Sequence, residues 1–426
     1  MSLLIILVFF GVGLLAMPLS LSLGVAAVAG LTASNVDYNL LPSRMMSAVN
    51  AFPLMTIPFF ILAGELMLKA GMMERLIDLA NTIVGRLRGG LGHVTVLAGM
   101  GLSTVSGAAV ADASALGSSL LPSLTRHYGV GFSAALCAAA ANLGPIIPPS
   151  GAMIVYAFMA GPTVSVGGLF MAGVVPGILL VIGMMAMCSF IAWRRNFPLT
   201  GDPFQVAAVV LELKRSLIIF LMPVIVIGGI VGGAFTATEG SAIAVVYALA
   251  IGLFVTKKLR VSDLPEAIVR AAITSAVVGA MIAFASVVTY MLTIDMLPQK
   301  LLVLIQSLTS SPTTYLLLVA LVLLIVGMFL ESNAAYIMLV PLLHPIAIKF
   351  GIDPLHFGFL FVFNLVIGML TPPVGVVLFV ICGVAKIPLG ELSRHVWPFI
   401  AMMYGLLIAC LFVPQIVLTL PRMMGY

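Results

Sequence analysis

The sequence is short of charged residues, cysteines and histidines, and each shortage argues against a class of protein. Only 8% of its 426 residues are charged, whereas a soluble domain carries about 25%. Its four cysteines stand in apolar runs without a Cys-x-x-Cys pair, and its five histidines form no His-x-x-x-His pair. Neither a zinc site nor a disulfide framework is indicated, and we expect no cofactor. The net charge is +5, but the basic residues form no long run, so we assign them to loops at a membrane surface rather than to nucleic-acid binding.

Long apolar runs dominate the sequence instead. Hydrophobic residues make up 62% of it, the mean hydropathy is +1.26, and roughly ten to twelve stretches approach the ~20 residues that span a bilayer. This predicts an all-α, polytopic membrane protein. Residues 2–31 lack the basic flank of a cleavable signal, which predicts a permanent first span. Further spans are expected at 48–70, 166–193, 216–233, 239–256, 267–296 and 397–420, with an interfacial amphipathic helix at 72–88.

Some of these apolar runs contain residues that are out of place in an ordinary spanning helix. Residues 93–126 are interrupted by serines, a glycine and a carboxylate at 103–112, and residues 129–160 are interrupted at 145–149 by prolines. Unpaired backbone groups are tolerated at membrane depth only where protein or a watery cavity covers them. We therefore expect a re-entrant hairpin and a broken helix that surround a site for an ion or polar solute.

The second half of the chain repeats this pattern. Asn142 precedes Pro148-Pro149 as Asn364 precedes Pro372-Pro373, and Gly129 and Gly351 precede the two asparagines by the same number of residues. Apolar arms at 313–330 and 336–348 enclose a second polar break at 327–335, with Pro341 and Pro345 expected to disturb the returning arm. These matches predict an inverted-repeat transporter with two re-entrant helical hairpins.

Polar residues inside the breaks are the candidate site residues. Asp112 and Glu331 are the carboxylates of the two breaks, and a charge at the centre of a membrane helix costs about 2.5–3.5 kcal/mol. They serve either transport or a buried structural role. Uncharged oxygens come from Ser103, Ser106, Asn142, Ser150, Asn333 and Thr371. Such oxygen-rich sets suit hard cations and polar solutes rather than zinc or copper.

Other functions fit less well. The segment 101–105 lacks the final glycine of a Gly-x-Ser-x-Gly motif, and no His-Glu-x-x-His is present, so the protein is not expected to be an enzyme. A channel is disfavoured because paired hairpins in an inverted repeat favour alternating access. Glu65 and Lys69 are spaced to pair on one helix face, and a direct role of Glu65 in transport is the alternative. Thr236 to Glu239 fits a capping box. The turn at 234–239 joins the spans 216–233 and 239–256. Positive charge on both flanks of this pair of spans places 194–215 and 257–270 in the cytoplasm.

Four segments together give the chain a resemblance to a known family. They are 58–65 (PFFILAGE), 106–112 (SGAAVAD), 144–150 (GPIIPPS) and 371–375 (TPPVG). With them, the sequence resembles the large membrane subunit of tripartite ATP-independent periplasmic (TRAP) transporters, the DctM-like family. A family Thr-Pro-Thr-Glu turn is represented by 236–239, with Ala237 in place of the proline. The likeness extends over essentially the whole chain.

The resemblance implies a sodium-driven importer of organic acids in the bacterial inner membrane, working as an elevator. The moving part would comprise 91–193 and 313–396, and the scaffold 1–90 and 194–312, followed by a C-terminal span within 397–426. A small four-helix membrane subunit and a periplasmic substrate-binding protein would be separate chains. A binding-protein-independent anion transporter or ion antiporter of similar hairpin design is the alternative, and a structural membrane scaffold is a third class.

Site residues follow from the resemblance and from the breaks together. Sodium would be held by backbone carbonyls and by Ser103, Ser106, Asn142, Gly327, Asn333 and Thr371. The organic acid would lie near Ser106, Asn142, Pro149, Ser150 and Pro373, with helix N-termini facing its carboxylate. Asp112 and Glu331 would orient the hairpins or balance charge.

Overall fold

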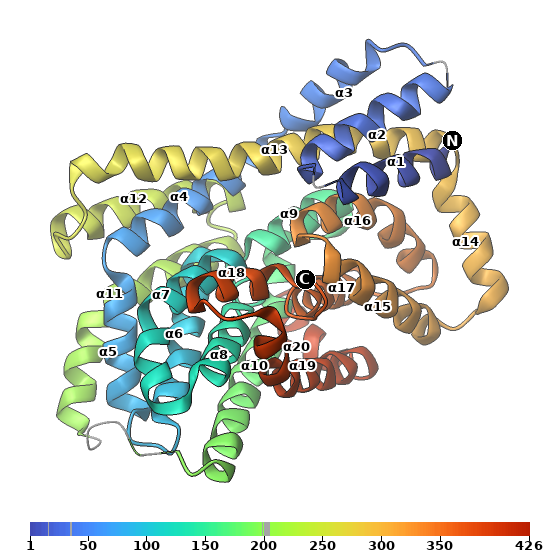
Figure 1. Cartoon of the computed structure of the whole chain (residues 1–426). Coiled ribbons are helices and arrows are strands. Elements are labelled where there is room, and N and C mark those ends of the chain that lie inside the picture. The colour runs from blue at the N-terminus through green and yellow to red at the C-terminus, as the bar shows by residue number, and fades with distance from the viewer. Residues whose placement is uncertain (16, 35, 198, 200–204) are drawn as a thin grey trace.

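The computed structural model describes residues 1–15, 17–34, 36–197, 199 and 205–426, and every regular element in them is a helix (Figure 1). The first half contains α1 (Ser2–Leu14), α2 (Leu19–Ser34), α3 (Leu40–Val49), α4 (Thr56–Lys69), α5 (Met72–Val84), α6 (Gly90–Ser106), α7 (Ala109–Tyr128), α8 (Val130–Ala141), α9 (Gly151–Ala160) and α10 (Val166–Arg194). The second half contains α11 (Val206–Val231), α12 (Ala237–Ala250), α13 (Leu264–Ile294), α14 (Leu297–Leu308), α15 (Pro312–Phe329), α16 (Ser332–Lys349), α17 (Pro354–Gly368), α18 (Val376–Ala385), α19 (Leu389–Phe412) and α20 (Gln415–Met423). The predicted all-α membrane fold is confirmed.

Six helical stretches of the described chain are long and apolar enough to cross a membrane. They are Phe52–Lys69, Val166–Arg194, Ala237–Val255, Val261–Ile294, Pro312–Phe329 and Leu389–Phe412. Other apolar helices, such as α8, α9, α17 and α18, are too short to span alone. These short helices fall in the two stretches around Pro148-Pro149 and Pro372-Pro373 that the sequence predicts to be broken.

Prolines divide two stretches that we predicted as single spans. α1 ends at Leu14 and α2 begins directly after Pro18, so the prediction of one span at 2–31 is wrong. α19 ends at Phe412 and α20 begins directly after Pro414, so the predicted span at 397–420 is also two helices. A proline lacks the N–H that continues a helix, and its ring clashes with the preceding turn.

Proline alone does not decide where a helix ends. Pro341 and Pro345, which we expected to disturb the returning arm, lie inside α16, which continues to Lys349. Neighbouring helices can satisfy the carbonyls that such prolines leave free. The polar segment 194–215 is likewise more helical than predicted, because α11 begins at Val206; residues 198 and 200–204 of that segment lie outside the described residues.

Both predicted hairpins and both broken helices are present. α6 and α7 form the first hairpin, with its tip at Gly107, and α15 and α16 form the second, with its tip at Leu330–Glu331. The chain breaks between α8 and α9 and again between α17 and α18. α18 packs on α7 and α9 packs on α16, so each hairpin contacts the broken helix of the other repeat. The two repeats therefore interlock, although the domain boundaries given above remain a prediction.

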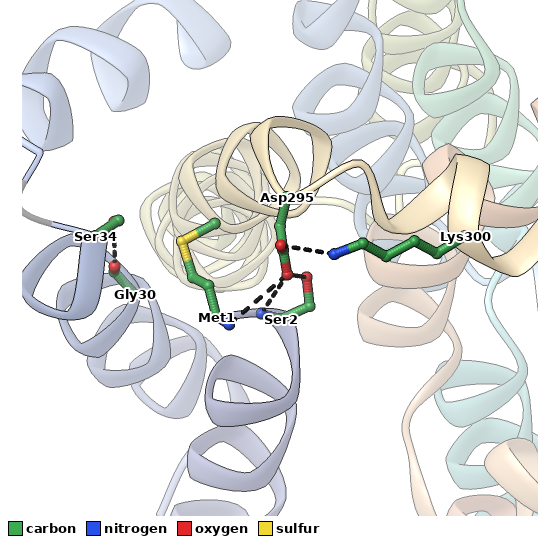
Figure 2. Close-up of polar contacts among 6 residues, drawn as sticks. All are labelled: Met1, Ser2, Gly30, Ser34, Asp295 and Lys300. Atoms are coloured by element: carbon green, nitrogen blue, oxygen red, sulfur yellow. Dashed lines mark hydrogen bonds and ion pairs between the residues drawn. The ribbon is translucent and has the colours of Figure 1, made fainter.

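The long helix α13 organises the other side of the molecule. It crosses the top of Figure 1 beside α4 and α12, and it packs against α2, α3 and α4. Its C-terminal end is tied to the start of α1 (Figure 2): the Ser2 amide and hydroxyl donate to Asp295 Oδ2 at 2.8 and 2.5 Å, and Lys300 Nζ lies 2.8 Å from Asp295 Oδ1. Within the region predicted as scaffold, α13 is thus the longest helix, and shorter helices pack along it.

Several basic residues lie around the adjoining ends of α4 and α13. The end of α4 reaches the start of α13 through Lys69 Nζ and Glu266 Oε2, 2.6 Å apart. Arg75 of α5 donates to the Arg215 carbonyl of α11 at 2.9 Å, and Lys258 lies 3.0 Å from Glu74. We call this the basic end. Arg44 and Lys300 lie near the C-terminal end of α13, and Lys349 and Arg422 near that of α16; α14, which follows α13, packs on α16. This is the end opposite the basic end.

Candidate functional site

A cavity of about 990 Å³ separates the two hairpin tips from α4 and α13. Residues 105–111 of the first hairpin and 331–333 of the second line it on one side. α4 lines the facing side from Ile57 to Lys69, and α13 from Arg270 to Met281. Because Lys69 and Arg270 belong to its wall, the cavity extends from the hairpin tips to the basic end.

The tip of the first hairpin is closed around Asp112. This carboxylate is fully buried; it accepts a hydrogen bond from Ser106 Oγ and a longer one, 3.4 Å, from Ser103 Oγ. The Ser103 hydroxyl is also 2.7 Å from the Gly99 carbonyl oxygen. Ser106 faces the cavity, whereas Ser103 and Asp112 lie behind it. The structure therefore brings these three predicted residues together, with one at the cavity wall.

The first broken helix packs directly under this tip. Gly107 has φ +60°, and a Cβ there would lie 3.0 Å from both the Pro149 carbonyl oxygen and the Gly151 nitrogen. A Cβ on Gly144 would lie 2.6 Å from Asp112 Oδ2. Only glycine allows these approaches, and as a result the first turns of α7 and α9 both line the cavity.

Of the three predicted site residues in this broken helix, one lines the cavity and two are buried away from it. Pro149 lines the cavity. Ser150 does not: it is fully buried, its hydroxyl donates to the Pro145 carbonyl at 2.6 Å, and it caps α9 by accepting from the Met153 amide at 3.3 Å. Asn142 is also fully buried; its Nδ2 donates to the Val366 carbonyl at 2.7 Å, and its Oδ1 has no hydrogen-bond partner. Asn142 therefore links the two broken helices and leaves one buried oxygen free.

The second hairpin presents its carboxylate differently. Glu331 is the N-cap of α16: its Oε2 accepts from the Asn333 amide at 3.0 Å, and its Oε1 accepts from Asn333 Nδ2 at 3.0 Å. Both residues line the cavity. The negative charge of Glu331 is thus already matched to the positive end of α16.

The remaining predicted residues of the second half are not part of the cavity wall. Gly327 crosses Gly368 so closely that a Cβ on Gly327 would lie 3.0 Å from the Gly368 Cα. Thr371 is buried and its hydroxyl donates to the Ile367 carbonyl at 2.8 Å. Pro373 is exposed and is not part of the cavity wall.

The sequence analysis missed part of the cavity wall and mispaired one residue. Lys69 pairs with Glu266 and not with Glu65, so that prediction is wrong; the cause is the antiparallel approach of α13, which sequence spacing does not reveal. Glu65 lines the cavity, a position compatible with the alternative of a role in transport. The residues that the sequence analysis missed include Ser114 and Ser118 of α7, which also line the cavity. The serines are spaced i,i+4 and share one helix face, which was the available signal. The capping box of Thr236 and Glu239 is confirmed.

This arrangement suits an anion beside hard cations. The first turns of α7 and α9 contribute N–H groups that have no partner within their helices and attract negative charge. No cluster of three or more histidine, cysteine or acidic side chains that could hold a metal occurs in the described part of the chain. Any cation bound here would be held by hydroxyl, amide and carbonyl oxygens, as hard cations prefer.

Comparison with known proteins agrees with this geometry. Residues 5–416 match the family model described as the DctM component of the tripartite ATP-independent periplasmic transporter. The chain is 38% identical over 419 residues to a putative TRAP transporter large permease protein of Haemophilus influenzae, covering 96% of each chain. It is 37% identical to the sialic acid TRAP transporter large permease protein SiaM of Vibrio cholerae, covering 98% of this chain and 99% of SiaM.

A further relative and a solved structure extend the comparison. The C4-dicarboxylate TRAP transporter large permease protein DctM of Pseudomonas aeruginosa is 37% identical, with 90% of this chain and 89% of that protein covered. The YdaH transporter of Alcanivorax borkumensis has a similar fold at 14% identity, with a TM-score of 0.64 over 91% of this chain and 90% of YdaH. Identity and coverage at this level show that the chain belongs to the DctM family of TRAP transporter large permease subunits.

Proposed function

We propose that this subunit imports an organic acid across the bacterial inner membrane together with sodium ions, and that it receives the acid from a periplasmic binding protein. The supporting observation is the meeting of the first turns of α7 and α9 at the wall of one large cavity. Paired helix N-termini suit a carboxylate, and Ser106, Ser114 and Ser118 add hydroxyls for the rest of a polar acid. The names of relatives, which include sialic acid and C4-dicarboxylate transporters, agree in substrate class.

Sodium coupling is supported by the buried oxygens. Asn142 Oδ1 and its repeat counterpart Asn364 Oδ1 are buried acceptors without hydrogen-bond partners, and a buried unpaired polar atom is costly unless an ion or water satisfies it. By analogy with other hard cations, sodium would take about six oxygens. Oxygens around Ser103, Ser106 and Asn142 would form one sodium site. Oxygens around Gly327, Asn333 and Thr371 would form a second sodium site.

An elevator motion suits the interlocked repeats. Because α9 packs on α16 and α18 packs on α7, 91–193 and 313–396 would move as one body against α4 and α13. Positively charged ends of membrane proteins face the cytoplasm, so the basic end is the cytoplasmic one. The cavity, which extends to that end, then represents the state that releases the acid into the cell.

Two partner chains complete this proposal: a small four-helix membrane subunit and the binding protein. An isethionate TRAP transporter permease protein, DctMQ of Oleidesulfovibrio alaskensis, is 38% identical to this chain, which covers only 63% of it. The remaining third of DctMQ leaves room for such a small subunit.

Uptake into proteoliposomes tests the proposal. The chain is reconstituted with the small subunit and a candidate binding protein, and labelled organic acids are supplied with and without a sodium gradient. We expect uptake only when sodium, binding protein and both membrane subunits are present. Sodium-dependent uptake by the single chain without binding protein would favour the alternative, a binding-protein-independent transporter. No response to sodium under any condition would refute the coupling.

A further inference from the structure

A second pocket lies beyond the central cavity, toward the end opposite the basic end. It is an open pocket with a volume of about 360 Å³, lined by α3, α9, α13 and α16. We call it the outer pocket. Its wall includes Arg44, Phe158, Ser286, Thr289, Thr293, Ile337 and Pro341.

Arg44 is the charged residue of the outer pocket. Its guanidinium carbon lies 3.9 Å from the centre of the Tyr290 ring, and the Ser286 hydroxyl donates to the Arg44 carbonyl at 3.3 Å. None of the ion pairs among the described residues involves Arg44, whereas Lys300 and Arg422 at the same end face Asp295 and Asp353. Stacking on an aromatic ring leaves the N–H groups at the guanidinium edge available to an acceptor.

One face of α13 connects this arginine to the central cavity. Ser286, Thr289 and Thr293 follow helical spacing and share a face in the outer pocket. The same face continues toward the basic end with Arg270, Thr274, Val278 and Met281, which line the central cavity. α13 thus presents polar groups to both pockets along a single stripe.

Only a thin barrier separates the two pockets. On each of three helices, a residue that lines the central cavity stands at most four positions from one that lines the outer pocket. These neighbours are Val155 and Phe158 on α9, Asn333 and Ile337 on α16, and Met281 and Ile282 on α13. Four positions are about one helical turn, or about 5.4 Å. Two of the three helices belong to the body that would move, so a shift of about this size would join the pockets.

We propose that the outer pocket is a capture site for the carboxylate of the incoming organic acid. Arg44 binds the carboxylate, and the hydroxyls of Ser286, Thr289 and Thr293 bind its other polar groups until the hairpin tips move up to receive it. Arginine matches the planar, two-oxygen geometry of a carboxylate better than lysine does. This inference rests on the proposed function, because it assigns the place where the same anion first binds.

Uptake kinetics give the first test. In the reconstituted system described above, Arg44→Gln should raise the KM for the organic acid about tenfold, the effect of losing one charged hydrogen-bond donor, and Arg44→Lys should recover part of that loss. Arg422→Gln, at the same end but outside the pocket, is the matched control and should keep the wild-type KM. Absence of uptake by the wild type would reject the proposed function itself. A normal KM in Arg44→Gln, with normal wild-type uptake, would reject only the capture site.

Thiol labelling gives a second test that needs no binding protein. Thr289→Cys is made in a Cys382→Ser background, because the other native cysteines are buried. Its reaction rates with sulfonatoethyl methanethiosulfonate, an anion, and with the trimethylammonium analogue, a cation, report the local charge. We expect Arg44→Gln to lower the anion-to-cation rate ratio about fivefold, as loss of one nearby charge would. Succinate or sialic acid should slow labelling when Arg44 is present and not when it is absent. An unchanged ratio, or equal protection in both backgrounds, would show that Arg44 acts elsewhere, for instance in docking the binding protein.

Discussion

Replacing Gly368 by alanine should separate the second hairpin from the broken helix beside it. A Cβ at position 368 would lie 2.6 Å from the Gly327 Cα and 2.8 Å from the Gly327 carbonyl carbon. Carbon atoms in contact prefer about 3.5–4.0 Å, and these are backbone atoms that no side-chain rotation can move away. α15 and α17 would therefore have to move apart by about 1 Å.

Such a separation has an energetic cost that can be bounded. Overpacking a well-packed interface costs about 1–3 kcal/mol. The Gly375 amide also donates to the Met328 carbonyl at 3.0 Å, next to the crossing, and losing that hydrogen bond adds about 0.5–1.5 kcal/mol. Gly279 of α13 is the matched control, because a Cβ there meets nothing within 4 Å. Alanine at that position should be neutral or stabilise its helix by up to about 1 kcal/mol.

Thermal unfolding of the purified variants, followed by size-exclusion chromatography after heating, measures the effect. We expect Gly368→Ala to lose its monodisperse peak several degrees below the wild type, and Gly279→Ala to lose it at the same temperature or higher. Sodium should also protect Gly368→Ala less, because the displaced carbonyls surround a proposed sodium site. If Gly368→Ala is as stable as Gly279→Ala and equally protected by sodium, the close crossing is not rigid and the reasoning fails.

Three further predictions concern charged groups. Asp112→Asn and Glu331→Gln should both shift the sodium dependence of uptake, and the shift should be larger for Asp112, because it is fully buried; unchanged curves for both would favour purely structural roles. Glu266→Gln should leave the unfolding temperature unchanged, since its pair with Lys69 is exposed, and a clear loss of stability would contradict this. Hydrogen bonds from the Lys300 ammonium and then from Ser2 hold the pKa of Asp295 well below its usual range. The attachment of α1 to α13 through Asp295 is therefore fully present above the unfolded pKa near 3.9. It is lost only as the pH falls through the lower folded pKa. Hydrogen exchange in α1 should accordingly stay slow in mild acid for the wild type and be fast at neutral pH for Asp295→Asn.

Local chemistry was enough to predict where the helices break. A glycine at a positive φ, a pair of prolines and a polar residue cannot continue a helix in lipid, so the breaks at Gly107 and near Pro149 follow from the residues there. The repeat of the same pattern at 364–375 was visible for the same reason. The all-α class and both hairpins were therefore predictable without any tertiary contact.

The direction in which each side chain points, and the partner that it contacts, could not be predicted from local chemistry. Ser150 looked like a substrate ligand, but its hydroxyl caps α9 and bonds the Pro145 carbonyl, which turns it away from the cavity. Lys69 was assigned to Glu65, one turn away, yet its partner Glu266 comes from a helix almost two hundred residues later. Both outcomes depend on packing between distant segments, which spacing along one helix does not encode.

The two repeats share a backbone plan but divide the chemistry of the site between them. In the first, Asp112 belongs to the first turn of α7 but is held behind the wall by Ser103 and Ser106, so no carboxylate of that hairpin lines the cavity. In the second, Glu331 sits on the first turn of α16 and already occupies the positive end of that helix. An acid in the cavity would thus meet the carboxylate of the second hairpin but not that of the first. In the coupling proposed above, a sodium ion bound beside Asn333 would offset the repulsion between Glu331 and the acid, so the acid would bind better with sodium than alone.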